Sequence, residues 1–267
     1  MKGVSHVACQ GATVAYRKEG SGPGLVLVHG TGGGSEANWA ACAERLAKDW
    51  TIVRPDYAGS GATVDDGRRL TVEYLANQVL AAAVDAKATP FHVVGFSLGA
   101  AVAVQIAAME PKLLRSLTLL GGFASSDDAR LQLQFRLWRD LIARDRAALA
   151  KLILLTGFAP ETLSGFGPAV IDDAIRQTLE ATNWHGLDRQ IDLDLHLNVE
   201  EAASRVITRT LVVGHRLDHM VPPHHARRLA KLIQGAAYRE IEAGHLAPME
   251  EPELVSNIIA DFLRQRS

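Results

Sequence analysis

The sequence has few cysteines and no excess of positive charge, and each absence excludes a class of protein. Its two cysteines, Cys9 and Cys42, cannot form a disulfide framework, and neither lies in the spacing of a metal-binding motif. The formal net charge is −2, so no basic field would gather nucleic acid or anionic lipid. No apolar run reaches the ~18 residues that would span a bilayer, and the first residues lack the apolar core of a secretory signal. We expect a cytoplasmic protein, a monomer or homodimer, that binds neither nucleic acid nor membrane.

The sequence does contain a regular alternation of short apolar runs and segments with helical spacing. A hairpin at 5–10 and 13–18 comes first. The expected strands that follow are 24–29, 51–55, 91–94, 117–120, 210–213 and 238–241. The expected helices are 38–48, 75–84, 98–109, 224–232 and 254–263. Strands that alternate with helices predict an α/β fold, with a mostly parallel central sheet and helices on both faces.

Residues 124–205 break this alternation. Leu131, Phe135, Trp138 and Ile142 recur at helical spacing, and glycines and prolines then divide the segment into short pieces. No strand is evident there. We predict a helical cap, or lid, at 124–205 inserted after the sixth strand, with residues 1–123 and 206–267 forming the core domain.

The clearest chemical signal is the sequence Gly-Phe-Ser-Leu-Gly at 95–99, between an expected buried strand and an Ala-rich helix. A nucleophilic serine must be pushed out of the backbone on a tight strand-to-helix turn. The residues two before and two after it must then be small, because a Cβ would collide with the turn. Gly95 and Gly99 meet this need, so Ser97 is the predicted nucleophile. The following helix would direct its free N–H groups toward an oxyanion formed beside Ser97.

A serine nucleophile needs a general base, and the base needs a carboxylate to orient it. His245 follows the last expected strand, and Asp218 follows the one before it. The chain order serine, aspartate, histidine is the order found in α/β-hydrolase sheets. Asp127 and Asp128, after the sixth strand, are the alternative acids. Serine chemistry of this kind needs neither a metal nor an organic cofactor, so we expect none.

Together, the turn at His29 and Gly30, the serine turn, the Asp218 loop and the His245 loop resemble the α/β-hydrolase superfamily. The resemblance covers the chain apart from the insertion, which is similar to that family's cap. It implies Ser97 as nucleophile, His245 as general base and Asp218 as its orienting acid. It also implies an oxyanion hole formed by the backbone N–H groups of Leu98 and Thr31, with Gly32 as the alternative to Thr31. By the same resemblance, His29 has a structural role.

The reaction is less closely defined than the fold. The loop from His29, with Trp39 downstream, is similar to that of meta-cleavage-product hydrolases, which split C–C bonds. Leu246 stands where those enzymes commonly have tryptophan, and the segment after His245 resembles esterases and lactonases. We therefore expect a serine hydrolase (esterase or lactonase) that cleaves an ester or lactone of a small to medium, largely apolar substrate. A C–C bond hydrolase and a non-hydrolytic member of the fold are the alternatives.

Aromatic residues of the insertion would build an apolar chamber over Ser97. The residues expected in the substrate pocket are Trp39, Phe135, Trp138, Phe158, Trp184, His219 and Leu246, with Leu152 and Phe166 as further candidates. His224 and His225 are adjacent on an expected helix and cannot share one of its faces. We therefore expect them to be solvated and not to bind a metal.

Overall fold

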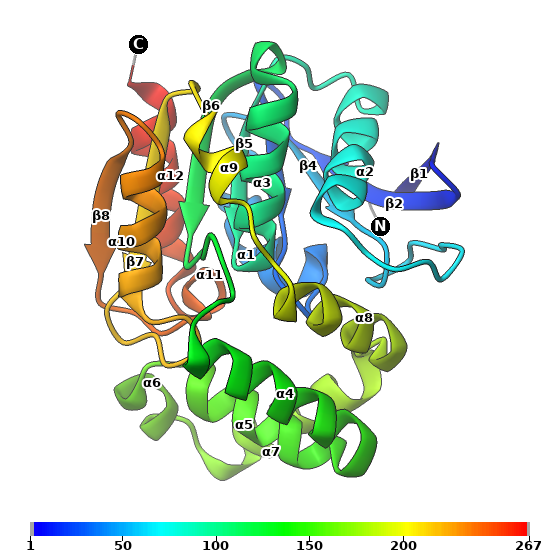
Figure 1. Cartoon of the computed structure of the whole chain (residues 1–267), viewed down its shortest axis with the longest axis vertical. Coiled ribbons are helices and arrows are strands. Elements are labelled where there is room, and N and C mark those ends of the chain that lie inside the picture. The colour runs from blue at the N-terminus through cyan, green and yellow to red at the C-terminus, as the bar shows by residue number, and fades with distance from the viewer. Residues whose placement is uncertain (1–2, 266–267) are drawn as a thin grey trace.

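The computed structural model describes residues 3–265, and its centre is an eight-stranded sheet with helices on both faces (Figure 1). The strands lie in the order β1-β2-β4-β3-β5-β6-β7-β8. Their bounds are β1 Val4–Cys9, β2 Ala12–Glu19, β3 Gly24–Val28, β4 Thr51–Asp56, β5 Phe91–Phe96, β6 Leu114–Leu120, β7 Thr210–His215 and β8 Ala237–Ile241. Strands β3 to β8 run parallel, and only the β1–β2 hairpin and its pairing with β4 are antiparallel. The predicted α/β-hydrolase fold class is confirmed.

Two hydrophobic cores, one on each face of the sheet, hold the helices in place. Trp39 of α1 (Ser35–Leu46) and Phe262 of α12 (Pro252–Arg264) belong to one core. Leu75 of α2 (Val72–Asp85), Ile106 of α3 (Leu98–Met109) and Leu229 of α10 (Pro223–Leu232) belong to the other. Every residue of β3, β5 and β7 is buried, as expected for strands covered on both faces.

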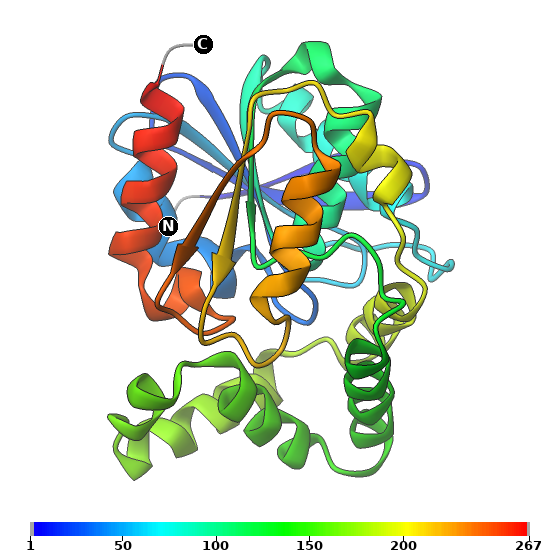
Figure 2. The same cartoon turned by 60° about the vertical axis from the view of Figure 1, so that its left-hand side comes forward.

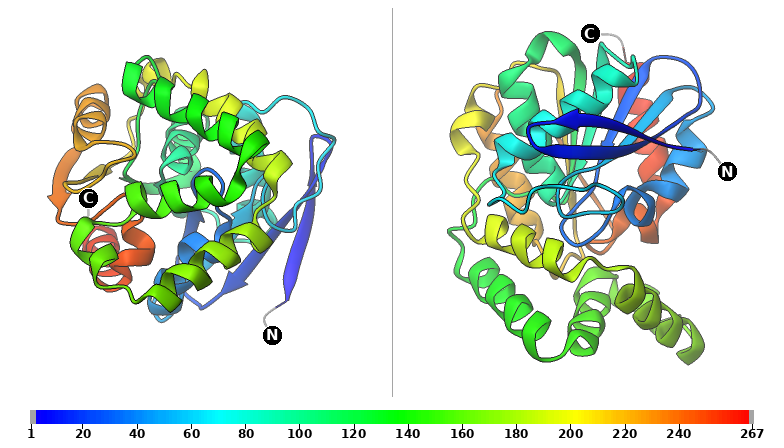
Figure 3. Two further views of the ribbon diagram at one scale, coloured as in Figure 1. Left: turned by 90° about the horizontal axis from the view of Figure 1, so that it is seen from below. Right: turned by 90° about the vertical axis from the view of Figure 1, so that its right-hand side faces the viewer.

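Helices α4 to α8 form the inserted helical cap across the carboxyl ends of the parallel strands (Figure 2). Their bounds are α4 Ala129–Arg144, α5 Arg146–Gly157, α6 Pro160–Ser164, α7 Pro168–Ala181 and α8 Trp184–Leu195. Seen from below, they are arranged around the end of the sheet where the strands finish (Figure 3). The sheet therefore forms the floor of the space beneath the cap, and the cap forms its roof.

The two ends of the insertion lie side by side and form a neck. The Ser126 N–H donates to the Leu197 carbonyl at 3.0 Å, and the Val199 N–H donates to the Ala124 carbonyl at 2.7 Å. Helix α9 (Glu200–Ser204) follows this neck and packs against α3 and α10 of the core. Helices α4 to α8 therefore lie between the two sides of this neck, and α9 packs with the helices that cover the sheet.

The remaining short elements are a 3₁₀ turn at Pro111–Leu113 and α11 (Ala247–Glu250), which follows the last strand. Within residues 3–265, no helix combines the length and the apolar character needed to cross a membrane.

Candidate active site

Ser97 lies on a strained turn between β5 and α3. Its backbone has φ 55° and ψ −123°, an unusual conformation for a residue with a side chain. A Cβ built on Gly95 would come within 2.2 Å of the Gly99 carbonyl oxygen. A Cβ on Gly99 would come within 2.4 Å of the Val28 carbonyl oxygen. Only glycine fits at both positions, which is the local reason that this sequence can hold the turn.

The structure brings Ser97, His245 and Asp218 together from three separate loops. His245 Nε2 lies 3.0 Å from Ser97 Oγ, and His245 Nδ1 lies 2.7 Å from Asp218 Oδ2. The other carboxylate oxygen of Asp218 accepts the backbone N–H groups of Met220 at 2.8 Å and Val221 at 2.7 Å. All three side chains are buried. This is the hydrogen-bonded order that a base-activated serine requires.

The alternative acids have other partners. Asp127 is exposed and pairs with Arg228, with contacts of 3.1 and 3.3 Å. Asp128 caps the first turn of α4 by accepting the Leu131 N–H at 3.0 Å. Asp218, and neither of these two, is the carboxylate that contacts His245.

The backbone N–H groups of the loop after β3 differ in whether they have a hydrogen-bond partner. The Gly30 N–H donates to Asn38 Oδ1, and the Gly32 N–H donates to Gln190 Oε1, both at 2.9 Å. Within residues 3–265, neither the Thr31 N–H nor the Leu98 N–H has a hydrogen-bond partner. These two amides are therefore available to an oxyanion, whereas the Gly32 amide, the predicted alternative, is occupied.

His29 shapes this loop and lies beneath it. Its ring stacks on Tyr57 with centroids 3.9 Å apart, and Nδ1 lies 2.8 Å from the Gly30 carbonyl oxygen. Tyr57 in turn donates its hydroxyl to the His29 carbonyl at 2.8 Å. Burial lowers the pKa of His29, so the imidazole is neutral at pH 7. These contacts fit a structural role.

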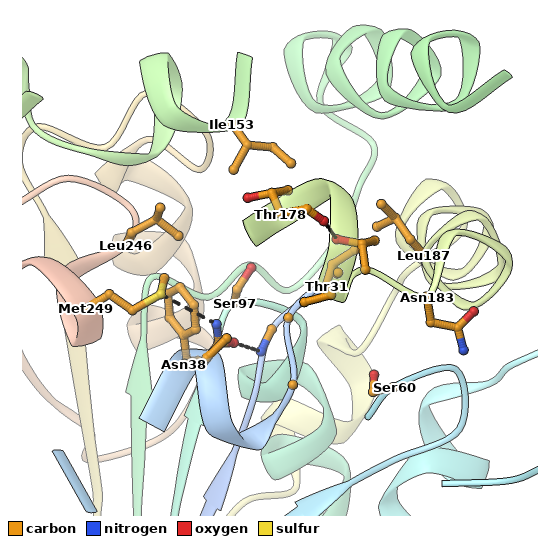
Figure 4. Close-up of a pocket in the computed structure, with 18 of the residues that line it drawn as sticks. Thr31, Asn38, Ser60, Ser97, Ile153, Thr178, Asn183, Leu187, Leu246 and Met249 are labelled. Atoms are coloured by element: carbon orange, nitrogen blue, oxygen red, sulfur yellow. Dashed lines mark hydrogen bonds between the residues drawn. The ribbon is translucent and has the colours of Figure 1, made fainter. Parts of the chain in front are cut away.

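A cavity of about 670 Å³ opens above Ser97 between sheet and cap. In Figure 4, Ser97 lies on the floor, with Leu246 and Met249 on one side and Leu187 and Asn183 on the other. Of the residues expected in the pocket, those that line it are Phe135, Trp138, Phe158, Trp184 and Leu246.

Two expected pocket residues do not line the cavity, and the reasons are local. Trp39 is fully buried in the core under the sheet, where it packs edge-on against Phe96 with ring centroids 6.3 Å apart. His219 is exposed, because the turn that directs the N–H groups of Met220 and Val221 toward Asp218 leaves His219 on the outside. The further candidates Leu152 and Phe166 are also absent from the lining; Phe166 packs behind Phe158.

Comparison with known proteins agrees with this fold. A family profile described as the alpha/beta hydrolase family matches residues 25–258. The chain belongs to the α/β-hydrolase family. Over 252 residues this hydrolase is 51% identical to pyrrolizixenacetamide deacetylase of Xenorhabdus hominickii, which covers 94% of this chain and 95% of the relative.

Relatives of lower identity include hydrolases described as acting on other substrates. The hydrolase is 26% identical to 2-hydroxy-6-oxo-6-(2'-aminophenyl)hexa-2,4-dienoic acid hydrolase of Metapseudomonas resinovorans, over 96% of this chain and 89% of the relative. The solved structure of a hydrolase from Pseudomonas aeruginosa superposes with a TM-score of 0.86 at 26% identity, covering 98% of each chain. The predicted membership of the α/β-hydrolase superfamily is confirmed.

Several features of this hydrolase's site were not found from the sequence. Ala174, Thr178 and Ala181 of α7 line the cavity, and their helical spacing in the sequence could have indicated that they share one face of a helix.

His215 is a second such residue and lies close to the acid, with Nδ1 3.9 Å from Asp218 Oδ2. Burial lowers the pKa of His215 to about 4, so it stays neutral beside Asp218.

Glu250 joins the His245 loop to the cap. Its carboxylate accepts the Gly244 N–H at 2.9 Å, the Ala159 N–H at 3.2 Å and the Thr162 hydroxyl at 2.5 Å. The Leu246 N–H also donates to the Gly157 carbonyl at 2.9 Å. The loop that carries His245 is thereby held against the turn between α5 and α6.

One group of side chains in residues 3–265 has the composition of a metal site. Asp128, His224 and His225 each place one ligand atom within 4.8 Å of the others. His224 is exposed as predicted, but His225 is buried, which corrects the expectation that both are solvated. The two rings lie against each other with centroids 4.1 Å apart, and Asp128 is already engaged as the cap of α4.

Proposed function

We propose that this α/β-hydrolase is a serine hydrolase that cleaves the acyl group from a small to medium, largely apolar substrate through an acyl-enzyme. The observation that carries the proposal is the buried chain of hydrogen bonds from Ser97 Oγ to His245 at 3.0 Å and on to Asp218 at 2.7 Å. No other arrangement near the cavity provides a nucleophile with both a base and an orienting acid within the described residues.

In the proposed reaction, His245 Nε2 takes the proton of Ser97 as Oγ attacks the substrate carbonyl carbon. The backbone N–H groups of Thr31 and Leu98 donate to the oxygen that becomes negative, and loss of one such donor typically costs about 3–4 kcal/mol of transition-state stabilisation. His245 then protonates the leaving alcohol or amine. Water, activated by His245, releases the acid from Ser97, and Asp218 holds the imidazole in one tautomer throughout.

The ester or lactone predicted from the sequence stays our first proposed substrate class, and the comparisons support extending it to acetamides. The relative at 51% identity is named a deacetylase of an acetamide. An ester and an acetamide differ only in the atom that leaves, and His245 can protonate either. The apolar lining from Phe135, Phe158, Leu187 and Leu246 suits a hydrophobic leaving group.

C–C bond hydrolysis is the second candidate, supported by the dienoic acid hydrolase among the relatives. A cavity of about 670 Å³ has room for either kind of substrate, so the choice between them depends on chemistry and not on size. Esters and acetamides with aryl leaving groups, tested beside a dienone acid, distinguish the two candidates.

The test is hydrolysis of p-nitrophenyl esters from acetate to decanoate and of p-nitroacetanilide by wild type, Ser97→Ala, His245→Ala and Asp218→Asn. We expect all three variants to stay folded and to lose at least about 10³-fold in kcat. Asp127→Asn is the matched control and should keep wild-type activity. Turnover near the wild-type rate in Ser97→Ala would refute the proposal. Activity on the dienone acid alone would favour the second candidate.

A further inference from the structure

One face of α8 is pressed against the loop that holds the candidate oxyanion hole. Leu187, Gln190 and Asp194 are spaced by three and four residues, so they share a helix face. A Cβ on Gly32, which has φ +71°, would come within 2.8 Å of Leu187 Cδ1. The cap helix and the oxyanion loop therefore fit each other closely along this face.

Two polar side chains from that face hold the loop. Gln190 Oε1 accepts the Gly32 N–H at 2.9 Å, and Gln190 Nε2 donates to Ser60 Oγ at 2.7 Å. Asp194 Oδ2 accepts the Thr31 hydroxyl at 2.6 Å. Gln190 and Asp194 are fully buried, so breaking one of these bonds would leave a buried polar group without a partner, which is costly.

These contacts fix the peptide units on both sides of the Thr31 amide. Asn38 engages the Gly30 N–H before it, and Gln190 engages the Gly32 N–H after it. The hydroxyl of Thr31 donates to Asp194, so this residue cannot turn about its own backbone without breaking that hydrogen bond. The Thr31 N–H itself has no hydrogen-bond partner within the described residues, so it is free to bind an oxyanion.

We propose that Gln190 and Asp194 are positioning residues, through which the inserted cap holds the Thr31 N–H in place to stabilise the oxyanion. This proposal rests on the serine hydrolase function proposed above. It makes the cap a part of the catalytic apparatus in addition to the roof of the substrate cavity. Neither residue touches the reacting atoms; both act through the loop.

The charge state of Asp194 agrees with this role. Burial raises the pKa of its carboxyl to about 8, and the bond from Thr31 only partly offsets the effect. At neutral pH the group is therefore uncharged. It accepts the Thr31 hydroxyl without placing a negative charge close to an oxygen that is itself becoming negative.

The test compares substitutions that remove the acceptor with substitutions that keep it. Gln190→Met and Asp194→Leu remove the contacts with little change in size, whereas Asp194→Asn keeps an acceptor oxygen for Thr31. Asp188→Asn is the matched control, because Asp188 lies on the same helix but pairs with Arg139 at 3.2 Å on the surface. Ser97→Ala provides the blank.

With p-nitrophenyl acetate, we expect kcat to fall about 10- to 100-fold in Gln190→Met and Asp194→Leu, because a displaced donor costs part of what a deleted donor costs. KM should stay within about twofold, because ground-state binding does not use the oxyanion hole. Asp194→Asn and Asp188→Asn should both keep most of the wild-type kcat.

A second readout reports on the oxyanion hole itself. Ser97 Oγ adds to the carbonyl carbon of a trifluoromethyl ketone and gives its proton to His245, so the adduct carries a negative oxygen like that of the tetrahedral state. The inhibition constant of the ketone should therefore rise in proportion to the loss of kcat/KM. A purely structural role would not produce this parallel. Thr31→Val removes the hydrogen bond between Thr31 and Asp194 by changing the loop instead of the cap. If a cap variant fails to fold, this variant tests the positioning role in its place.

The outcomes separate this inference from the function on which it rests. If Ser97→Ala still hydrolyses the ester, the proposed function fails. If Ser97→Ala is inactive while Gln190→Met and Asp194→Leu keep wild-type kcat and inhibition, the function stands and the positioning role is wrong. A rise in KM alone would also overturn it, because the two residues would then act in substrate binding.

Discussion

Replacing Asp194 with asparagine should make the protein more stable, and the gain should grow with pH. The folded carboxyl is fully buried, and its pKa is raised from the ordinary 3.8 to about 8. Between these two values the unfolded chain has released the proton while the folded chain retains it. The folded state thus binds more protons, so the free energy of unfolding falls as the pH rises. Asparagine has the same shape, keeps an acceptor for the Thr31 hydroxyl and does not titrate.

The size of the effect follows from the shift. Each pH unit between the two pKa values removes about 1.4 kcal/mol of stability from wild type and none from the variant. The advantage of Asp194→Asn should therefore increase by about 3 kcal/mol between pH 5 and pH 7. Comparing two pH values cancels any constant difference in packing or hydrogen bonding between the two side chains. The increase should end above the folded pKa of about 8.

Urea unfolding of both proteins at pH 5, 6 and 7, followed by tryptophan fluorescence, measures this difference. Gln190→Met is the control, because it disturbs the same loop without removing a titrating group. Its stability should differ from wild type by the same amount at every pH. An advantage of Asp194→Asn that does not change with pH would mean that the carboxyl is ionised and paired in the folded protein. Asp194 would then carry a negative charge beside the oxyanion loop, contrary to the role proposed for it.

Three further substitutions test the rest of the site. Gly95→Ala should yield no folded enzyme, because its Cβ would lie 2.2 Å from the backbone oxygen of Gly99; soluble expression and circular dichroism measure this. Phe158→Ala should enlarge the cavity and shift the best p-nitrophenyl ester toward longer acyl groups, measured as kcat/KM along the series. Trp39→Ala should cost about 3–5 kcal/mol in urea unfolding and leave KM unchanged, because Trp39 is a core residue.

Each of these three predictions has a control variant or an outcome that would contradict it. Gly167→Ala should be tolerated, because nothing lies within 4 Å of a Cβ at that position. Folded and active Gly95→Ala would show that the turn at Ser97 can relax. An unchanged order of preference in Phe158→Ala would exclude this ring from substrate contact. A raised KM in Trp39→Ala would mean that Trp39 does affect substrate binding, as the sequence had suggested.

The parts of the site that could be predicted from the sequence are those set by local geometry. The turn at Ser97 needs glycine on both sides, and the clash of a Cβ at Gly95 or Gly99 with nearby backbone is the physical reason. The positions of Asp218 and His245 follow from a topology in which successive strands end at the same edge of the sheet. The three side chains lie within hydrogen-bond distance as their chain order indicated.

The parts that could not be predicted depend on how one element is turned against another. Trp39 is an aromatic residue near the oxyanion loop in sequence, but the rotation of α1 directs it into the core. Gln190 and Asp194 look like the solvated face of an amphipathic helix. Only the docking of α8 on the loop shows that this polar face is buried and that the loop supplies its partners.

The neck of the insertion has a consequence for exchanging parts between members of the family. The backbone bonds between residues 124–126 and 197–199 bring the two ends of the cap together, so a foreign cap could be joined at these points without opening the sheet. Such a chimaera would have a substrate cavity with a new lining from the foreign cap. It would also lose the acceptors that Gln190 and Asp194 provide, unless the donor cap carries equivalents on the matching helix face. Grafted lids that fold well and bind substrate but turn over slowly are the expected result, and restoring these two side chains is the repair.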